Sequence, residues 1–142
     1  MDIIHHGAYD GVTGSCHELV VSDQRSVLID CGLFQGEDNQ GRKNSVIDFP
    51  LDHVESLFLT HVHIDHVGRI PYLIDAGFNG PIYCSQPTAA LLPLMLEDAI
   101  RLGITRKQKV IEHLLRTIRS MLKPLPYHQW NDMGRGLKVR FQ

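Results

Sequence analysis

The sequence is short of the features that mark membrane, secreted and fibrous proteins. No stretch approaches the roughly 18 to 20 apolar residues needed to span a bilayer, and the first residues lack the basic and apolar regions of a signal peptide. Cysteine occurs only as Cys16, Cys31 and Cys84, with no C-x-x-C pair, which argues against a disulfide framework or a cysteine zinc site. Repeats and glycine-rich phosphate-binding motifs are also absent. We therefore expect a cytoplasmic protein without membrane contact.

The composition is that of one globular domain. Hydrophobic residues make up 43% of the 142 residues and charged residues 21%, which is enough to build a packed core and excludes intrinsic disorder. The net charge of −2 conceals an uneven distribution. Residues 1–98 contain 14 acidic and 4 basic residues, whereas residues 99–142 contain 2 acidic and 10 basic residues. The basic half indicates either a polyanionic partner such as RNA or, more simply, a solvated helix face. Its main cluster comprises Arg101, Arg106, Lys107, Lys109, Arg116 and Arg119.

The pattern of apolar and turn-forming residues predicts strands that alternate with helices, which is an α/β class. The predicted strands are 2–6, 18–22 and 26–30 (a hairpin), 56–60, 81–85 and 137–141. The predicted helices are 67–76, 87–102 with a kink at Pro93, and 105–122 capped by Thr105, with a helical turn at 51–55.

Chemistry-bearing residues concentrate directly after the apolar strand SLFLT. The segment Thr60–Gly68 reads THVHIDHVG, so three histidines and an aspartate fall within six residues. His61 and His63 are two residues apart and point the same way in extended backbone, while Asp65 and His66 lie at the turn into a helix. Burying such groups without partners would be costly, and imidazole with carboxylate suits zinc, manganese or iron. The segment therefore predicts a metal site with two ligands for each of two ions.

The motif THVHIDH resembles the metal-binding signature of the metallo-β-lactamase-fold hydrolases. Four further segments narrow the resemblance to the β-CASP branch, which contains RNA-processing nucleases: GAYDGVTGSCHEL, SVLIDCGLFQG, GPIYCS and LLPLMLEDAI. The resemblance implies an αββα sandwich in which helices flank a mixed sheet. It also implies a zinc-dependent phosphodiester hydrolase that attacks single-stranded RNA with a metal-activated hydroxide.

The resemblance also assigns roles to individual residues. It implies that His61 and His63 bind the first zinc ion, and that Asp65 and His66 bind the second. Asp65 would in addition accept a proton from the attacking water. Asp30, at the end of SVLID, would orient the metal-binding loop through hydrogen bonds, as metal-bound histidines generally require.

The chain departs from the family pattern in its later part. Members of the family need further histidine and aspartate ligands and a β-CASP cap domain, and no residues here match them. The resemblance thus implies that residues 1–142 form the N-terminal part of a metallo-β-lactamase-like domain. We expect this part alone to hold a partial zinc site at most, to be inactive, and to expose a sheet edge that favours self-association.

Two other functions stay open at this point. One is a different hydrolase of the same fold, acting on a thioester, a lactam or a small phosphodiester. The other is a non-catalytic module that binds metal or RNA. Among the remaining histidines, His5 and His6 either approach the metal pocket or form a strand-end pair, His17 is interpreted as structural, and His53, His113 and His128 have no partner at ligand spacing. The cysteines fit small buried hydrophobes, and Gly7 and Gly32 fit places where loops approach the site closely.

Overall fold

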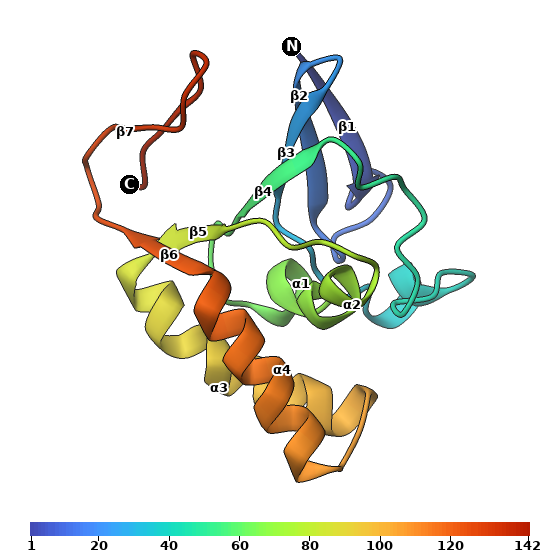
Figure 1. Ribbon diagram of the computed structural model, residues 1–142. Helices are drawn as coiled ribbons and strands as arrows, with labels where there is room; N and C mark the ends of the chain where they lie inside the picture. The colour runs from blue at the N-terminus through green and yellow to red at the C-terminus, as the bar shows by residue number, and fades with distance from the viewer.

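The computed structural model covers residues 1–142 and consists of one six-stranded sheet, four α-helices and a small C-terminal hairpin (Figure 1). The strands of the sheet are β1 (Asp2–Gly7), β2 (Cys16–Ser22), β3 (Arg25–Ile29), β4 (Val54–Phe58), β5 (Ile82–Ser85) and β6 (Leu122–Leu125). The helices are α1 (Ile64–Val67), α2 (Ile70–Asp75), α3 (Gln86–Gly103) and α4 (Gln108–Met121), with a 3-10 turn η1 at Gly36–Asn39. The hairpin pairs β7 (Asn131–Asp132) with β8 (Lys138–Val139). No helix is both long enough and apolar enough to cross a bilayer.

The sheet is mixed, as expected, and its strands follow one another in chain order. β1, β2 and β3 are antiparallel neighbours, whereas β3 to β6 run parallel. The predicted hairpin is present as β2 and β3, with Leu19 opposite Val27. Because β3 and β4 are parallel, the loops that follow them leave the sheet at the same edge. This arrangement places Asp30 beside the segment that begins at Thr60.

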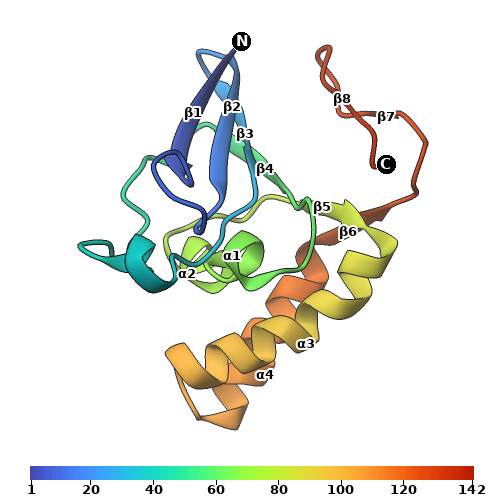
Figure 2. The same ribbon diagram turned by 180° about the vertical axis from the view of Figure 1, so that it is seen from behind.

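The hydrophobic core lies between the sheet and the four helices, which cover one face of it (Figures 1 and 2). Leu28, Leu57 and Ile82 of three neighbouring strands are fully buried there. They pack against one stripe each of α3 and α4, which includes Leu96 and Ile111. The α/β class is thus confirmed, and within these residues the helices form a single layer.

The C-terminal hairpin lies against the other face of the sheet. Arg25 of β3 is only 5% exposed, and its guanidinium donates to the carbonyl oxygens of Met133 and Gly134 at 2.9 Å each. The same side chain pairs with Glu55 of β4. One buried arginine therefore ties the hairpin to the sheet.

The predicted helix at 67–76 is wrong in its continuity. It is two short helices, α1 and α2, that are interrupted at Gly68 and Arg69. Pro71 explains the break, because it has no N–H to donate to the carbonyl of Val67 four residues earlier. The break matters for the site, since it lets α1 end directly after the histidine cluster.

Three other predicted elements, at residues 51–55, 105–122 and 137–141, also differ from the structure. Residues 51–55 are not helical, because β4 already begins at Val54. Thr105 does not cap α4: its hydroxyl accepts from Lys107 N, and the helix begins only at Gln108. The predicted helix at 87–102, by contrast, is present as α3, which contains Pro93. Only Lys138 and Val139 of the predicted last strand form one, and they pair with β7 instead of the main sheet.

Two strands were not predicted, β6 and the short β7. Leu122–Leu125 forms β6 although it contains Pro124, which the sequence pattern marks only as a helix terminator. Proline is tolerated because β6 is the edge of the sheet and needs a hydrogen-bonding partner on one side only.

Candidate metal centre

The four predicted ligands lie together in the segment that runs from the end of β4 into α1. His63 has extended backbone (φ −62°, ψ 148°) immediately before α1, and Asp65 and His66 lie in the first turn of that helix. The ring centroid of His61 is 4.6 Å from that of His63 and 4.0 Å from that of His66. The geometry thus gathers the three imidazoles that the sequence brought within six residues.

Asp30 is the buried anchor of this loop. It follows β3 in the left-handed conformation (φ 61°) and is 2% exposed. Its carboxylate accepts from Thr60 N at 2.8 Å, from Thr60 Oγ1 at 2.8 and 3.0 Å, and from Ser15 Oγ at 3.2 Å. His66 Nδ1 lies 2.7 Å from Asp30 Oδ2. The predicted contact between Asp30 and the histidine loop is therefore present.

These hydrogen bonds orient two imidazoles. A carboxylate only accepts, so His66 Nδ1 donates to Asp30, and in a neutral ring Nε2 is then the nitrogen with the available lone pair. Thr60 has one hydroxyl hydrogen, which it donates to Asp30, so its oxygen accepts from His61 Nδ1 at 3.0 Å. His61 Nε2 is then also free. An Nε2 lone pair held in place by a partner on Nδ1 is the usual state of a metal-binding histidine.

The surroundings of His61 favour its neutral form. The pKa of His61 is lowered by burial first and then by the neighbouring His66 and His63. A neutral imidazole is the form that binds metal ions. His66 Nε2 and Asp65 Oδ2 are 3.6 Å apart, so a nitrogen and an oxygen donor face each other at this end of the loop.

The loops before β2 and after β3 form hydrogen bonds with the backbone of this segment. Ser15 N donates to Asp65 O at 2.9 Å, Cys31 N to His66 O at 2.8 Å, and Leu33 N to Ile64 O at 3.1 Å. A Cβ added to Gly32 would lie 1.6 Å from Asp65 O, so only glycine fits there. The predicted close approach at Gly32 is thus confirmed. Gly7 is equally confined, since its Cβ would lie 2.0 Å from Gly14 O.

The donor set fits zinc in its chemistry, but it does not form a closed site. Three imidazoles and one carboxylate are ligands that zinc prefers, and His66 is already oriented by Asp30. However, no three His, Cys, Asp or Glu side chains surround a common point suited to a metal ion.

Sequence reasoning did not find two residues that complete the network. Thr60 and Ser15 both hydrogen-bond to Asp30. Thr60 directly precedes His61, and Ser15 directly precedes β2. Their signal was weak, because a hydroxyl at a strand end is common in any loop. Only the register of β2, β3 and β4 brings them to one carboxylate.

The other histidines lie outside the cluster. His5 Nδ1 is 2.8 Å from His17 Nδ1, and His17 reaches Ser15 Oγ at 3.4 Å. His6 pairs with Glu18 at 2.8 Å and stacks on Phe49, so it has a structural partner. The exposed His53, His113 and His128 do not join the site.

The cysteines and the basic residues have ordinary surroundings. All three cysteines are free and buried, as predicted, and burial raises the pKa of Cys84 to about 11. Arg101 pairs with Glu97 within α3 at 2.9 Å. The other residues of the basic cluster are exposed, and whether they contact RNA stays a prediction.

Comparison with known proteins places these features in a wider context. The family model described as the metallo-beta-lactamase superfamily matches residues 12–132. A protein named Ribonuclease TTHA0252 from Thermus thermophilus is 36% identical over 140 residues, which cover 94% of this chain and 30% of the relative. Transcription termination factor FttA from Methanosarcina mazei is 31% identical over 140 residues, which cover 95% of this chain and 22% of the relative. The chain thus spans less than a third of the length of these relatives.

A solved structure shows the same fold. The crystal structure of Zn²⁺-bound PqqB from Methylobacterium extorquens superimposes with a TM-score of 0.52 over 92% of this chain and 42% of the other. The identity is 15%, so this likeness concerns the arrangement of strands and helices alone.

Proposed function

Because the chain belongs to the metallo-beta-lactamase superfamily, we propose that it is part of a zinc-dependent hydrolase of the β-CASP type that cleaves RNA phosphodiester bonds. The observation that carries the proposal is the cluster of His61, His63, Asp65 and His66, in which Asp30 fixes the ring of His66 through a 2.7 Å hydrogen bond. Relatives named as a ribonuclease and a transcription termination factor support RNA as the substrate.

The chain's own residues have defined tasks in this proposal. His61 and His63 would hold one zinc ion, and Asp65 with His66 the second. Bound zinc supplies an acidified water molecule and polarises the phosphate oxygens. Asp30 keeps the His66 proton on Nδ1, and Thr60 does the same for His61, so both Nε2 atoms stay available. Asp65 accepts the proton of the attacking water at a carboxylate oxygen.

The activity is proposed for the longer protein that contains this chain. The chain covers 30% or less of the relatives described above, and no three of its donors surround a common point suited to a metal ion. We therefore expect residues 1–142 alone to bind zinc weakly and to lack turnover. We place the protein in the cytoplasm, where three unpaired cysteines remain reduced.

The decisive experiment replaces both histidines of the first pair in the full-length protein. His61→Ala/His63→Ala should lower the zinc content and reduce cleavage of a labelled single-stranded RNA by at least about 10³-fold, because metal-ion catalysis supplies most of the rate. RNA affinity should change little. His53→Ala/His113→Ala, which removes two exposed histidines, is the matched control and should cleave at the normal rate.

Three results would contradict the proposal in different ways. Turnover that persists in the His61→Ala/His63→Ala variant would show that the cluster is not catalytic. Cleavage of a thioester, a lactam or a small phosphodiester, but not of RNA, would indicate another hydrolase of the same fold. RNA or zinc binding without any turnover would indicate a non-catalytic module.

A further inference from the structure

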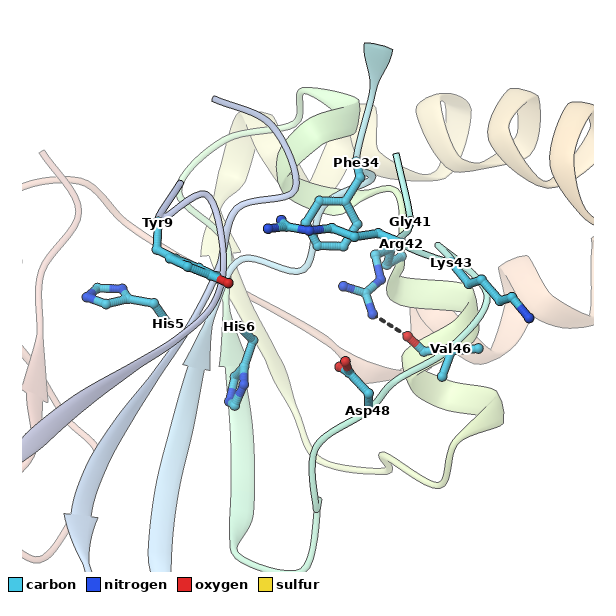
Figure 3. A pocket seen from close by; sticks show the side chains of 10 residues that line it. His5, His6, Tyr9, Phe34, Gly41, Arg42, Lys43, Val46 and Asp48 are labelled. Atoms are coloured by element: carbon cyan, nitrogen blue, oxygen red, sulfur yellow. Dashed lines mark hydrogen bonds between the residues drawn. The ribbon is translucent and has the colours of Figure 1, made fainter. Parts of the chain in front are cut away.

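A second polar site lies at the same edge of the sheet as the histidine cluster. A cavity of about 470 Å³ opens between the end of β1 and residues 34–48 (Figure 3). Its walls carry three permanent cations, Arg42, Lys43 and Arg69, against one carboxylate, Asp48. The volume is in the range of small-molecule sites. The excess of cations favours an anion as its occupant.

Arg69 is a buried cation without a counter-ion. It is 2% exposed, and it forms no ion pair. Its Nε donates to Asn44 O at 3.2 Å and its Nη2 to Val46 O at 2.5 Å, the second of which is drawn in Figure 3. Nη1 donates to no protein atom, yet it is not sealed from solvent. Since an unpaired buried charge is costly, this guanidinium has a donor and a charge to offer to a ligand.

Arg42 adds a second guanidinium beside the same aromatic ring. Its carbon Cζ lies 4.7 Å from the ring centroid of Phe34, and that of Arg69 lies 5.2 Å from it. Arg42 Nη2 donates to both carboxylate oxygens of Asp10, which raises the pKa of Arg42. Its Nε and Nη1 make no hydrogen bond in the protein. The N–H groups of Arg42 that Asp10 leaves unused are therefore available to a bound anion.

The loops that carry these groups are fixed in place. Phe34 N donates to Asn44 Oδ1 at 2.8 Å, and Asn44 Nδ2 donates back to Phe34 O at 3.0 Å. The carboxylate of Asp38 accepts from the backbone N–H groups of Val12 and Thr13. The cavity is therefore preorganised, which lowers the entropic cost of binding.

The cavity is connected to the candidate metal centre through the backbone. Arg69 follows His66 by three residues, and its N–H donates to Cys31 O at 2.9 Å, while Cys31 N donates to His66 O. An anion held by Arg69 would therefore sit on the same structural unit as the histidine cluster.

We propose that this cavity binds the phosphate group of a nucleotide through the guanidiniums of Arg42 and Arg69. Arginine suits the task because its planar fork pairs with two phosphate oxygens. Tyr9 also lines the cavity and is 66% exposed. Arg42 Cζ lies over its ring at 5.5 Å from the centroid, so a base would stack on the opposite face. The nucleotide is either free or a unit of RNA, and the RNA form rests on the function proposed above.

The test measures binding of AMP and of adenosine to the full-length protein by calorimetry. AMP should bind and adenosine should not, and Arg42→Gln should weaken AMP binding by about tenfold or more, as expected for the loss of a charge-assisted contact. Arg42→Lys keeps the charge but loses the planar fork of the guanidinium. Its affinity for AMP should lie between those of the unaltered protein and of Arg42→Gln. Arg135→Gln is the control, because it removes an exposed arginine from the hairpin on the far side of the molecule (Figure 1).

A second arm identifies the source of the phosphate. If the site holds RNA, Arg42→Gln should raise KM for RNA cleavage, leave kcat unchanged and reduce the salt dependence of binding. An unchanged KM together with weakened AMP binding would assign the site to a free nucleotide. Circular dichroism on each variant confirms that it is folded.

The proposal is overturned if AMP does not bind, or if it binds folded Arg42→Gln and Arg42→Lys as tightly as the unaltered protein. These outcomes are independent of the catalytic test. AMP binding does not require His61 and His63, so a failure of RNA cleavage would leave the phosphate site standing, and the reverse also holds.

Discussion

Two segments that follow strands of the same sheet are held in very different ways. The histidine-bearing loop (residues 60–69) accepts backbone hydrogen bonds from Ser15, Cys31 and Leu33 and donates to the carboxylate of Asp30. The C-terminal hairpin (residues 131–139) is tied to the sheet by the side chain of Arg25. A segment that must keep several donors in place is fixed along its backbone, whereas one anchoring side chain is enough for a covering hairpin.

The largest effect should come from closing the space beside the histidine-bearing loop. Gly32→Ala puts a Cβ 1.6 Å from Asp65 O. This oxygen belongs to the backbone, so it cannot move aside as a flexible side chain would. We expect the free energy of unfolding, measured with urea, to fall by about 3 kcal/mol or more. Zinc binding should weaken at the same time, since Asp65 and His66 must shift.

A matched glycine provides the control for that variant. A Cβ at Gly103 in α3 meets only Tyr72 Oη at 3.7 Å, so Gly103→Ala should be neutral or slightly stabilising. Equal losses in both variants would mean that the tight fit at Gly32 is not what holds the loop.

A smaller and more local effect is expected at the hairpin. Arg25→Met removes two hydrogen bonds to carbonyls and the pair with Glu55 but keeps an apolar stem, so the loss should be about 2 kcal/mol. Hydrogen exchange should rise at residues 131–139 and stay unchanged at 60–69. Faster exchange in both segments would show that the hairpin also supports the histidine-bearing loop, and the contrast between them would be lost.

The contrast also explains how much the sequence could reveal. The cluster from His61 to His66 was predictable because its members are neighbours in the chain, and a strand followed by a helix start brings them together locally. The apolar strands near Leu28, Leu57 and Ile82 were predictable for a similar reason, since strands buried on both faces read as continuous apolar runs.

Features that depend on distant partners were not predictable. Pro124 reads as a helix terminator, and only its place on the sheet edge allows it in β6. The last predicted strand pairs with β7 because Gly134, Arg135 and Gly136 all adopt positive φ and reverse the chain. The alternation of apolar and basic residues does not reveal this turn. The pairing of Asp30 with Ser15 and the shared ring of Arg42 and Arg69 likewise arise from register and loop packing.

The smallest expected effect tests whether the strand behind the histidine-bearing loop contributes to its pH sensitivity. The pKa of His17 is lowered from its ordinary value of 6.5, first by burial and then by His5. Below about pH 6.5 the unfolded chain therefore binds a proton that the folded chain resists, so the free energy of unfolding falls as the pH decreases through this window. His17→Gln should lose less stability than the unaltered protein between pH 7.5 and 5.5 in urea unfolding. His113→Gln, which changes an exposed residue, should lose as much as the unaltered protein.

Because His17 contacts Ser15 and Ser15 contacts Asp30, hydrogen exchange at 60–69 should respond to acid more than exchange at 131–139. If the His17→Gln and unaltered proteins lose the same stability between pH 7.5 and 5.5, protonation of His17 in β2 does not affect the histidine-bearing loop. The acid response of that loop would then originate in its own histidines.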